Sequence, residues 1–281
     1  MEILERVNTM SERHDSWHKQ DEDGKNNFFD MLDSSKNVKL MVFRLLGALK
    51  YFYSFKELEE RLNVPAQILW RYVTLRTVPE RSTAEKILNK IRSSHIIDDI
   101  LSKYYIENEE LWSLLSNPGI MTLAGLRALD DLKDQKINVI VSAPDSYAAA
   151  LGATFSSLFH AKLCAASHSP YSKHIISKNY KVSSEFFDVL LLPRECISRK
   201  SKIIIVTIDG NKTALLSSMI DLAITRQTHV EGIVAVMGSK SKIEELAKTK
   251  LKYNTKTIVL INTDDIKEIK HKEQSVKVDF K

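Results

Sequence analysis

The chain has 281 residues, of which 43% are hydrophobic and 27% are charged, and its net charge at pH 7 is +5. This length suits two domains better than one, and the composition is that of an ordinary soluble globular protein. There is no run of 18 apolar residues, and residues 1–15 lack an apolar core behind a basic start. We therefore expect no membrane span, no signal peptide and a cytoplasmic location.

Charge is unevenly distributed along the chain. Residues 1–35 contain 9 acidic and 4 basic side chains, whereas residues 36–92 contain 12 basic and 5 acidic ones. The remaining residues are nearly balanced. A basic segment beside a neutral body is typical of a part that binds an anionic partner, although a solvated helical bundle has the same charge. The acidic stretch, broken by "DEDGKNN", predicts a polar N-terminal arm over residues 1–35.

Helical patterns follow the arm as far as residue 116. The stretch "VKLMVFRLLGALKYF" has apolar residues on all sides, as a buried helix has. Ser82 or Thr83 is expected to cap the helix in "STAEKILNKIRSSHIIDDILSKYY". Asn117-Pro118-Gly119 then breaks the pattern, and no β-rich segment precedes residue 137. We assign residues 36–116 to an all-helical domain.

The pattern changes after residue 136. Helical stretches at residues 147–160, 212–225 and 239–248 alternate with five short runs rich in β-branched residues, which are "INVIVSAP", "AKLCAA", "KIIIVTI", "VEGIVAVMG" and "TKTIVLI". Such alternation predicts a parallel sheet with helices on both faces. The expected fold class is therefore α/β, with the second domain at residues 117–281 and a linker helix at about residues 117–136.

The two cysteines, Cys164 and Cys196, lie in apolar, strand-like surroundings. Neither has a second cysteine or a histidine at metal-ligand spacing. We expect no zinc site and no disulfide, as in a protein of a reducing cytoplasm.

The segment "FKELEERLNVPAQILWRYVTLRTVP" has the pattern of a helix-turn-helix. Leu58 and Leu62 share one face of the first helix, and Leu69 anchors the second. Asn63 stands at the turn, where the left-handed conformation costs Asn little. The tail "RYVTLRTVP" resembles the "RYxxGRxxP" ending of lambda-repressor-like domains, with Leu75 in the place of the usual Gly.

This resemblance implies that the second helix enters the major groove of DNA. Glutamine suits adenine and arginine suits guanine, so the residues expected at base edges are Ala66, Gln67 and Arg71. Those expected at the DNA backbone are Thr74, Arg76 and Thr77. Alternatively, the arginines only solvate a small helical bundle. Trp70 is expected to be packed or partly exposed and not to read bases, because a Trp in a small helical domain usually belongs to the core. Glu59 stands where such domains usually have a small residue.

Residues 137–238 resemble the type I phosphoribosyltransferase fold in the order and spacing of their segments. "VIVSAPDSYAAALGATFSSLFHAKLCAAS" is similar to the first strand, the pyrophosphate loop, the first helix and the second strand. Residues 168–197 take the place of the flexible hood. "SKIIIVTIDGNKTALLSSMIDLAITRQTHVEGIVAVMG" is similar to the strand, phosphoribosyl-pyrophosphate loop, helix and strand that follow. Archaeal regulators that join a helix-turn-helix to such a domain share this layout, as do bacterial purine operon repressors with a different DNA-binding domain.

The loop "TIDGNKT" departs from the family pattern. The family has two adjacent acids that bind the ribose hydroxyls, followed by Thr-Thr-Gly-x-Thr around the 5′-phosphate. Here the loop is two residues shorter and the acidic pair is absent. The residues that the resemblance still implies for a phosphate or ligand are Asp209, Gly210, Asn211, Lys212 and Thr213, with Asp145 and Ser146 in the first loop. Asp209 is alternatively a helix cap.

The first loop, "SAPDSYAA", also lacks the basic residue that family members often place near the pyrophosphate. Asp145 adds a negative charge there. Three lysines of the hood could compensate, namely Lys173, Lys178 and Lys181, unless they are simply solvated. Two weakened anion sites argue against transfer chemistry, so we expect no catalytic residues and no metal site.

Taken together, these features predict a sequence-specific transcription regulator. It would bind palindromic double-stranded DNA as a homodimer and have no contact with a membrane. Its α/β domain would dimerise and sense phosphoribosyl pyrophosphate, a nucleotide or phosphate. One alternative is a catalytically active purine or pyrimidine phosphoribosyltransferase with an added helical domain. Another is an interaction or RNA-binding protein that docks through the helical domain.

Overall fold

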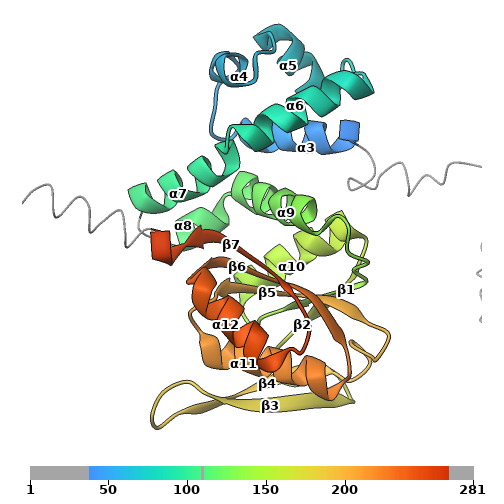
Figure 1. Ribbon diagram of the computed structural model, residues 1–281, viewed down its shortest axis with the longest axis vertical. Helices are drawn as coiled ribbons and strands as arrows, with labels where there is room; N and C mark the ends of the chain where they lie inside the picture. Colours follow the sequence, from blue (N-terminus) through green and yellow to red (C-terminus); the bar gives the residue numbers. More distant parts are fainter. Residues whose placement is uncertain (1–37, 109–110, 266–281) are drawn as a thin grey trace, which may run out of the picture.

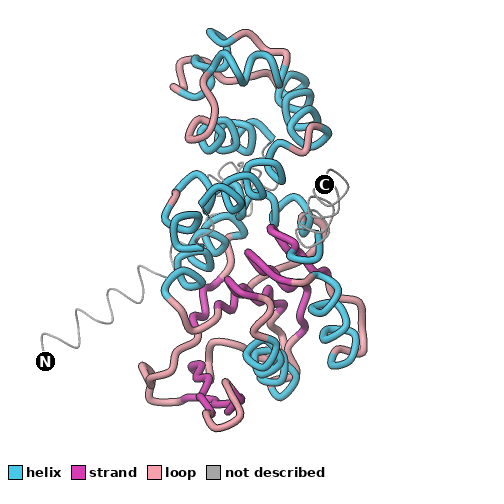
Figure 2. The backbone as a smooth tube through the Cα atoms, turned by 90° about the vertical axis from the view of Figure 1, so that its left-hand side faces the viewer, coloured by secondary structure: helices cyan, strands magenta, loops and turns pink. Residues whose placement is uncertain are grey.

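The computed structural model describes residues 38–108 and 111–265, which form two parts stacked along the long axis of the molecule (Figure 1). In the described residues up to Leu132, helices are the only regular secondary structure. The described strands all lie after Leu132. A view turned by 90° shows the same separation into a helical end and a sheet-containing end (Figure 2). The expected arm, residues 1–35, lies outside the described residues.

The helical part begins with a buried helix, as the apolar pattern predicted. Met41, Leu45 and Leu49 of this helix are all buried, because it is surrounded by the helices that follow. The helices are α3 (Val38–Leu49), α4 (Phe55–Leu62), α5 (Ala66–Val73), α6 (Arg81–Ser93), α7 (Ile96–Asn108), α8 (Leu111–Ser116) and α9 (Pro118–Leu132). None of the helices within the described ranges combines the length and apolar character that crossing a membrane requires.

The cap expected for α6 is wrong. Ser82 and Thr83 lie inside the first turn, because the backbone N–H of Ala84 already donates to the carbonyl of Glu80 at 2.9 Å. Glu80 therefore holds the N-cap position, and its side chain makes no capping hydrogen bond.

The second part contains a five-stranded parallel sheet in the order β2-β1-β5-β6-β7. Its strands are β1 (Val139–Ser142), β2 (Lys162–Ala165), β5 (Lys202–Asp209), β6 (His229–Gly238) and β7 (Lys256–Asn262). The helices between them are α10 (Ser146–Phe159), α11 (Thr213–Thr225) and α12 (Lys240–Lys250). All five predicted strands and all three predicted helices are present. The element order that the resemblance to type I phosphoribosyltransferases implied is thus confirmed.

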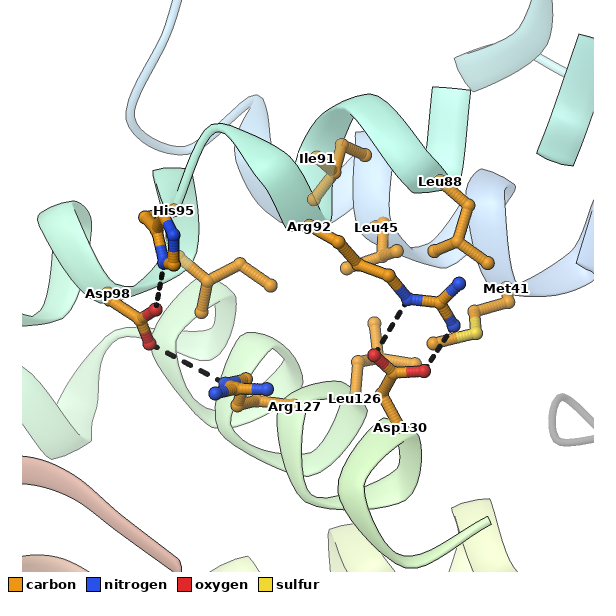
Figure 3. Close-up of a pocket in the computed structure, with 11 residues that line it drawn as sticks. Met41, Leu45, Leu88, Ile91, Arg92, His95, Asp98, Leu126, Arg127 and Asp130 are labelled. Carbon is orange, nitrogen blue, oxygen red and sulfur yellow. Dashed lines mark hydrogen bonds and ion pairs between the residues drawn. The ribbon is translucent and has the colours of Figure 1, made fainter. Parts of the chain in front are cut away.

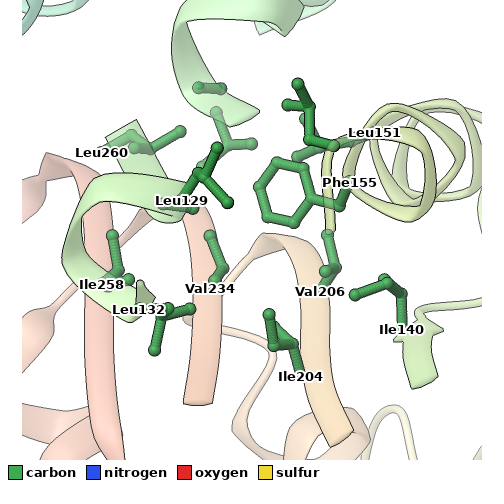
Figure 4. Packing of buried hydrophobic residues seen from close by; sticks show 14 of the residues in the cluster. Leu129, Leu132, Ile140, Leu151, Phe155, Ile204, Val206, Val234, Ile258 and Leu260 are labelled. Atoms are coloured by element: carbon green, nitrogen blue, oxygen red, sulfur yellow. The ribbon is translucent and has the colours of Figure 1, made fainter. Parts of the chain in front are cut away.

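One face of the sheet packs against α9 and α10. Leu129 and Leu132 from α9 meet Phe155 from α10 above Ile204 and Val234 of the central strands (Figure 4). On the opposite face lie α11 and α12 (Figure 1). Because α9 also packs against α3, it is a structural layer shared by both parts.

The segment expected to form a hood is an antiparallel hairpin of β3 (Ile175–Lys181) and β4 (Phe187–Pro193). This hairpin packs against α11 and returns the chain to the free edge of β2, where Ser167 and Leu191 exchange backbone hydrogen bonds of 3.0 and 2.9 Å.

The return of the chain to β2 corrects the expectation for the cysteines. Cys164 on β2 and Cys196 after β4 form a disulfide, with their Cα atoms 5.7 Å apart. The prediction of no disulfide failed because the two residues are 32 positions apart in sequence and meet only through the path of the hairpin.

Candidate DNA-contacting helix and ligand cavity

A tight turn joins α4 to α5. Asn63 has φ 56° and ψ 43°, the left-handed conformation predicted for it, and its N–H donates to the carbonyl of Glu59 at 2.8 Å. Ser54 and Glu57 form a reciprocal capping box at the start of α4, and these hydrogen bonds lower the pKa of Glu57. The turn at Asn63 therefore sets the orientation of α5 relative to α4, and the capping box stabilises the start of α4.

Glu59 has a structural role that explains its presence in place of a small residue. Its Oε2 accepts a hydrogen bond of 3.1 Å from the backbone N–H of Ala66, the first residue of α5. Pro65, which holds the N-cap position, provides no side-chain cap. The first turn of a helix attracts anions, and here a carboxylate of the chain itself meets that need. A phosphate bound beside α5 would consequently be held by side chains.

The residues predicted to contact DNA share one exposed surface. Leu69 is fully buried against the rest of the helical part, and Ala66 is half-buried at the start of α5. The other predicted contacts are all exposed, namely Gln67, Arg71, Thr74, Arg76 and Thr77. The second helix and the turn after it thus present hydroxyl, amide and guanidinium groups to solvent on the side away from Leu69.

The end of α5 is a Schellman turn with an unusual residue in it. Leu75 has φ 56°, its N–H donates to the carbonyl of Tyr72 at 3.1 Å, and the N–H of Arg76 donates to that of Arg71 at 2.9 Å. This is the position at which the resembling domains have Gly, which adopts positive φ without a steric penalty. The similarity of the tail thus reflects a backbone shape that Leu75 adopts under strain.

The Schellman turn places Arg76 above Trp70. The guanidinium carbon lies 4.4 Å from the centroid of the ring, within the range of a cation–π interaction. Trp70 is half-buried, which agrees with the expectation of a packed or partly exposed ring. The guanidinium of Arg76 covers one face of this ring. Arg61 lies in the same way over Tyr53, at 4.5 Å.

A second site is a cavity of about 540 Å³ at the carboxyl ends of β1 and β5. The sheet order reverses between these strands, because β2 follows β1 on one side and β6 follows β5 on the other. Such a switch point is where open α/β sheets usually bind ligands. Its lining comes from the starts of α10 and α11 and from the hairpin, and comprises Pro144, Asp145, His168, Tyr180, Lys181, Val182, Asp188, Asn211, Lys212, Thr213, Ala214 and Leu215.

Four of the seven predicted ligand residues line this cavity: Asp145, Asn211, Lys212 and Thr213. Asp145 also caps α10, accepting from the N–H of Ala148 at 2.7 Å. Lys212 is the N-cap residue of α11 and its side chain makes no capping hydrogen bond. The ammonium of Lys212 and the first turn of α11 therefore meet at one end of the cavity.

The other three predicted residues lie outside the lining. Ser146 is exposed at the first position of α10. Asp209 accepts from the N–H of Asn211 at 2.9 Å, so it supports the loop instead of capping the helix. Gly210 is buried, and its N–H donates to the carbonyl of Met237 at 2.7 Å. Gly210 is thus a packing position directly after the end of β5, beside β6.

The hairpin and the segment before it bring three further polar residues to the cavity that the sequence reasoning missed: His168, Tyr180 and Asp188. Asp188 Oδ2 lies 3.2 Å from His168 Nδ1 and accepts from the hydroxyl of Tyr180 at 3.3 Å. Burial, together with the charge of Asp188, raises the pKa of Tyr180 to about 12. Tyr180 and Asp188 are cross-strand partners, a relation that requires the register of the hairpin.

The three lysines considered for the hood have different surroundings. Lys181 lines the cavity. Lys178 is not among the lining residues and instead forms an ion pair of 3.4 Å with Asp221 of α11. Lys173 is exposed and is not among the lining residues.

The lining of the cavity therefore contains two lysines, Lys181 and Lys212, and two aspartates, Asp145 and Asp188. The cluster of His168, Asp188 and Tyr180 supplies directional hydrogen-bonding groups. An anionic group fits best at the Lys212 end, where the start of α11 adds to the positive potential. Within residues 38–108 and 111–265, no cluster of three or more His, Cys, Asp or Glu residues is suited to a metal ion.

No protein-family model matches the sequence, and no curated protein matches it. The chain is similar in structure to adenine phosphoribosyltransferase from Rhodothermus marinus, with a TM-score of 0.46 and 14% identity over 53% of this chain and 82% of that chain. For the Giardia lamblia enzyme complexed with 9-deazaadenine, the TM-score is 0.48 and the identity 14%, over 54% and 84% of the two chains. For the Trypanosoma brucei enzyme, in complex with AMP, pyrophosphate and ribose-5-phosphate, the TM-score is 0.47 and the identity 13%, over 54% of this chain and 68% of that chain.

Proposed function

We propose that this protein is a sequence-specific DNA-binding transcription regulator. The observation that carries the proposal is the exposure of Gln67 and Arg71 on α5 and of Arg76 in the Schellman turn that ends it. In a helix-turn-helix the second helix lies in the major groove, with side chains near its start at base edges. The excess of basic residues in segment 36–92 agrees with an anionic partner for this part alone.

The α/β part would then position two helical parts in a homodimer and sense a ligand. A two-fold symmetric dimer reads a palindrome, which doubles the base contacts. A phosphate-bearing ligand in the cavity would touch Lys212 and the hairpin, and a shift of either would change the distance between recognition helices. The loop lacks the family's acidic pair, so binding without phosphoribosyl transfer fits these residues better than catalysis does.

The test of DNA binding compares two arginine variants by fluorescence anisotropy. On the chain's own upstream DNA, Arg71→Ala should weaken selective binding by about 1–3 kcal/mol, because it removes a bidentate base contact. Arg76→Ala should weaken promoter and scrambled duplexes alike and reduce the slope of log affinity against log salt by about one, because it removes one phosphate contact.

Lys252→Ala is the matched control, because Lys252 is an exposed cation in the α/β part. Lys252→Ala should change neither the selective binding nor the slope of log affinity against log salt. Equal losses on both duplexes for Arg71→Ala would contradict the major-groove assignment. An absence of selective binding by the unmodified chain would contradict the regulator as a whole.

The cavity offers a specific observation in favour of the second candidate, an active phosphoribosyltransferase. It lies at the switch point of the sheet, where such an enzyme would bind its donor. Release of pyrophosphate from phosphoribosyl pyrophosphate in the presence of a purine or pyrimidine base, abolished by Lys212→Ala, would establish that activity. A ligand-dependent change in DNA affinity without turnover, also abolished by Lys212→Ala, would establish sensing.

A further inference from the structure

A crevice lies between α3 and α6 on one side and α9 on the other, and it is distinct from both sites above. It consists of two adjoining cavities of about 210 and 360 Å³, which share Met41, Leu88, Arg92 and Asp130. We call this pair of cavities the junction crevice. Figure 3 shows the smaller cavity, with α3 and α6 on one side and α9 on the other.

The polar groups at the rim of the junction crevice already have partners. Arg92 makes two hydrogen bonds to the carboxylate of Asp130, one of them 2.7 Å long. Arg127 lies 3.5 Å from Asp98, which also faces His95 (Figure 3). Charge at the rim is therefore balanced, and an occupant of the cavity does not need to bring a charge of its own.

The floor of the smaller cavity is apolar. It is formed by side chains from α3, α6, α7 and α9, namely Met41, Leu45, Leu88, Ile91, Ile97 and Leu126. Apolar side chains that line an opening to solvent favour an apolar occupant over water. A dry cavity of about 150 Å³ already accommodates a benzene-sized ring, so one phenyl ring fits here. An apolar side chain is thus the occupant that the lining favours.

The first described residues of the chain, at the start of α3, lie at this crevice. Val38, the first described residue, lines the larger cavity, and Met41, one turn further along α3, lines both. The preceding sequence is "FFDMLDSSKN", with Phe28, Phe29, Met31 and Leu32 among five consecutive residues. Leu32 and Val38 are six positions apart, a distance that an extended chain spans over at most about 20 Å. The apolar cluster is therefore tethered within reach of both cavities.

The charges of the larger cavity are balanced in the same way, because Glu85 and Lys133 both belong to its lining. The occupant is therefore selected by its apolar side chains and by the length of chain before Val38.

We propose that residues 28–32 of this chain dock into the junction crevice, with Phe28 or Phe29 inserted between α3, α6 and α9. The segment then holds α6 against α9, the helix that covers the sheet, because the same ring touches Leu88 of α6 and Leu126 of α9. The strap acts whether or not the helical part binds DNA.

The test uses the full chain with methyl-labelled Met and Leu residues. The double variant Phe28→Ser/Phe29→Ser should shift the NMR signals of Met41 and Leu126 and lower the Tm by about 4–8 °C, since a buried ring is lost. The control is Ile3→Ser/Leu4→Ser, which removes the other apolar cluster of the same arm and should leave both readouts unchanged.

Three outcomes would overturn the proposal. The first is that the double phenylalanine variant leaves the Met41 and Leu126 signals unchanged. The second is that the Ile3/Leu4 control moves them equally, which would make the effect a general one of arm hydrophobicity. The third is that the signals depend on protein concentration in the unmodified chain, which would assign the crevice to a second copy.

Discussion

At Leu75 the backbone has φ 56°, because the Schellman turn that ends α5 requires a left-handed residue there. A residue with a β-carbon pays about 1–2 kcal/mol for this conformation, whereas Gly does not. The side chain gains little in return, since 63% of its surface is exposed. The strain lies directly before Arg76, which the turn holds over Trp70.

Leu75→Gly is therefore expected to increase the free energy of unfolding by about 1 kcal/mol. The gain from relieved strain is partly offset by the greater conformational freedom of Gly in the unfolded chain. Urea denaturation followed by circular dichroism measures this change. Leu75→Ala serves as the control, because Ala keeps a β-carbon and should not stabilise the protein. If both variants have the same stability, the strain is not stored at this residue.

Among the elements, the β3–β4 hairpin determines the shape of the ligand cavity. It contributes Tyr180, Lys181 and Asp188 to the lining, and it is held at one end by α11 and at the other by the edge of β2. The disulfide between Cys164 and Cys196 adds a covalent link at that edge. In the chain-entropy account, closing a loop of 32 residues stabilises a fold by about 3–4 kcal/mol.

Cys196→Ser should accordingly lower the free energy of unfolding by about 3 kcal/mol, measured by urea denaturation without reductant. The unmodified chain under reducing conditions is the matched comparison and should have nearly the same stability as the variant. Unfolded without reductant, the oxidised chain should show no thiol that reacts with Ellman's reagent. Reaction of two thiols per chain would contradict the disulfide.

For the whole molecule, the two parts are joined through α9, which packs on α3 and also covers the sheet. Ion pairs from Arg92 to Asp130 and from Arg127 to Asp98 cross the same junction. A change in the α/β part therefore has a direct path to the helical part. This arrangement suits a regulator in which ligand binding and DNA binding affect each other reciprocally.

The proposed regulator is expected to form a homodimer at the concentrations at which it binds DNA selectively. Sedimentation equilibrium should then give twice the chain mass of 32.1 kDa. Footprinting should show two half-sites whose centres are about 10–10.5 base pairs apart, or a multiple of that spacing, since each recognition helix enters a major groove on the same side of the duplex. Selective binding by a monomer to a single half-site would contradict the dimer.

Local patterns in the sequence were enough for much of the fold. The apolar periodicity of the helical segment, the five β-branched runs and the left-handed turn at Asn63 all depend on residues within a few positions of one another, and each prediction is confirmed. The exposure of Arg71 and Arg76 follows from the same local spacing around Leu69.

Long-range packing accounts for the features that the sequence did not reveal. Cys164 meets Cys196, and Tyr180 meets Asp188, only because the hairpin folds back in one particular register. Gly210 is excluded from the cavity because the neighbouring strand β6 binds its backbone, and Lys178 because Asp221 of α11 lies beside it. Residues distant in the chain make these contacts, so they follow from the order of the strands and the packing of the helices on them.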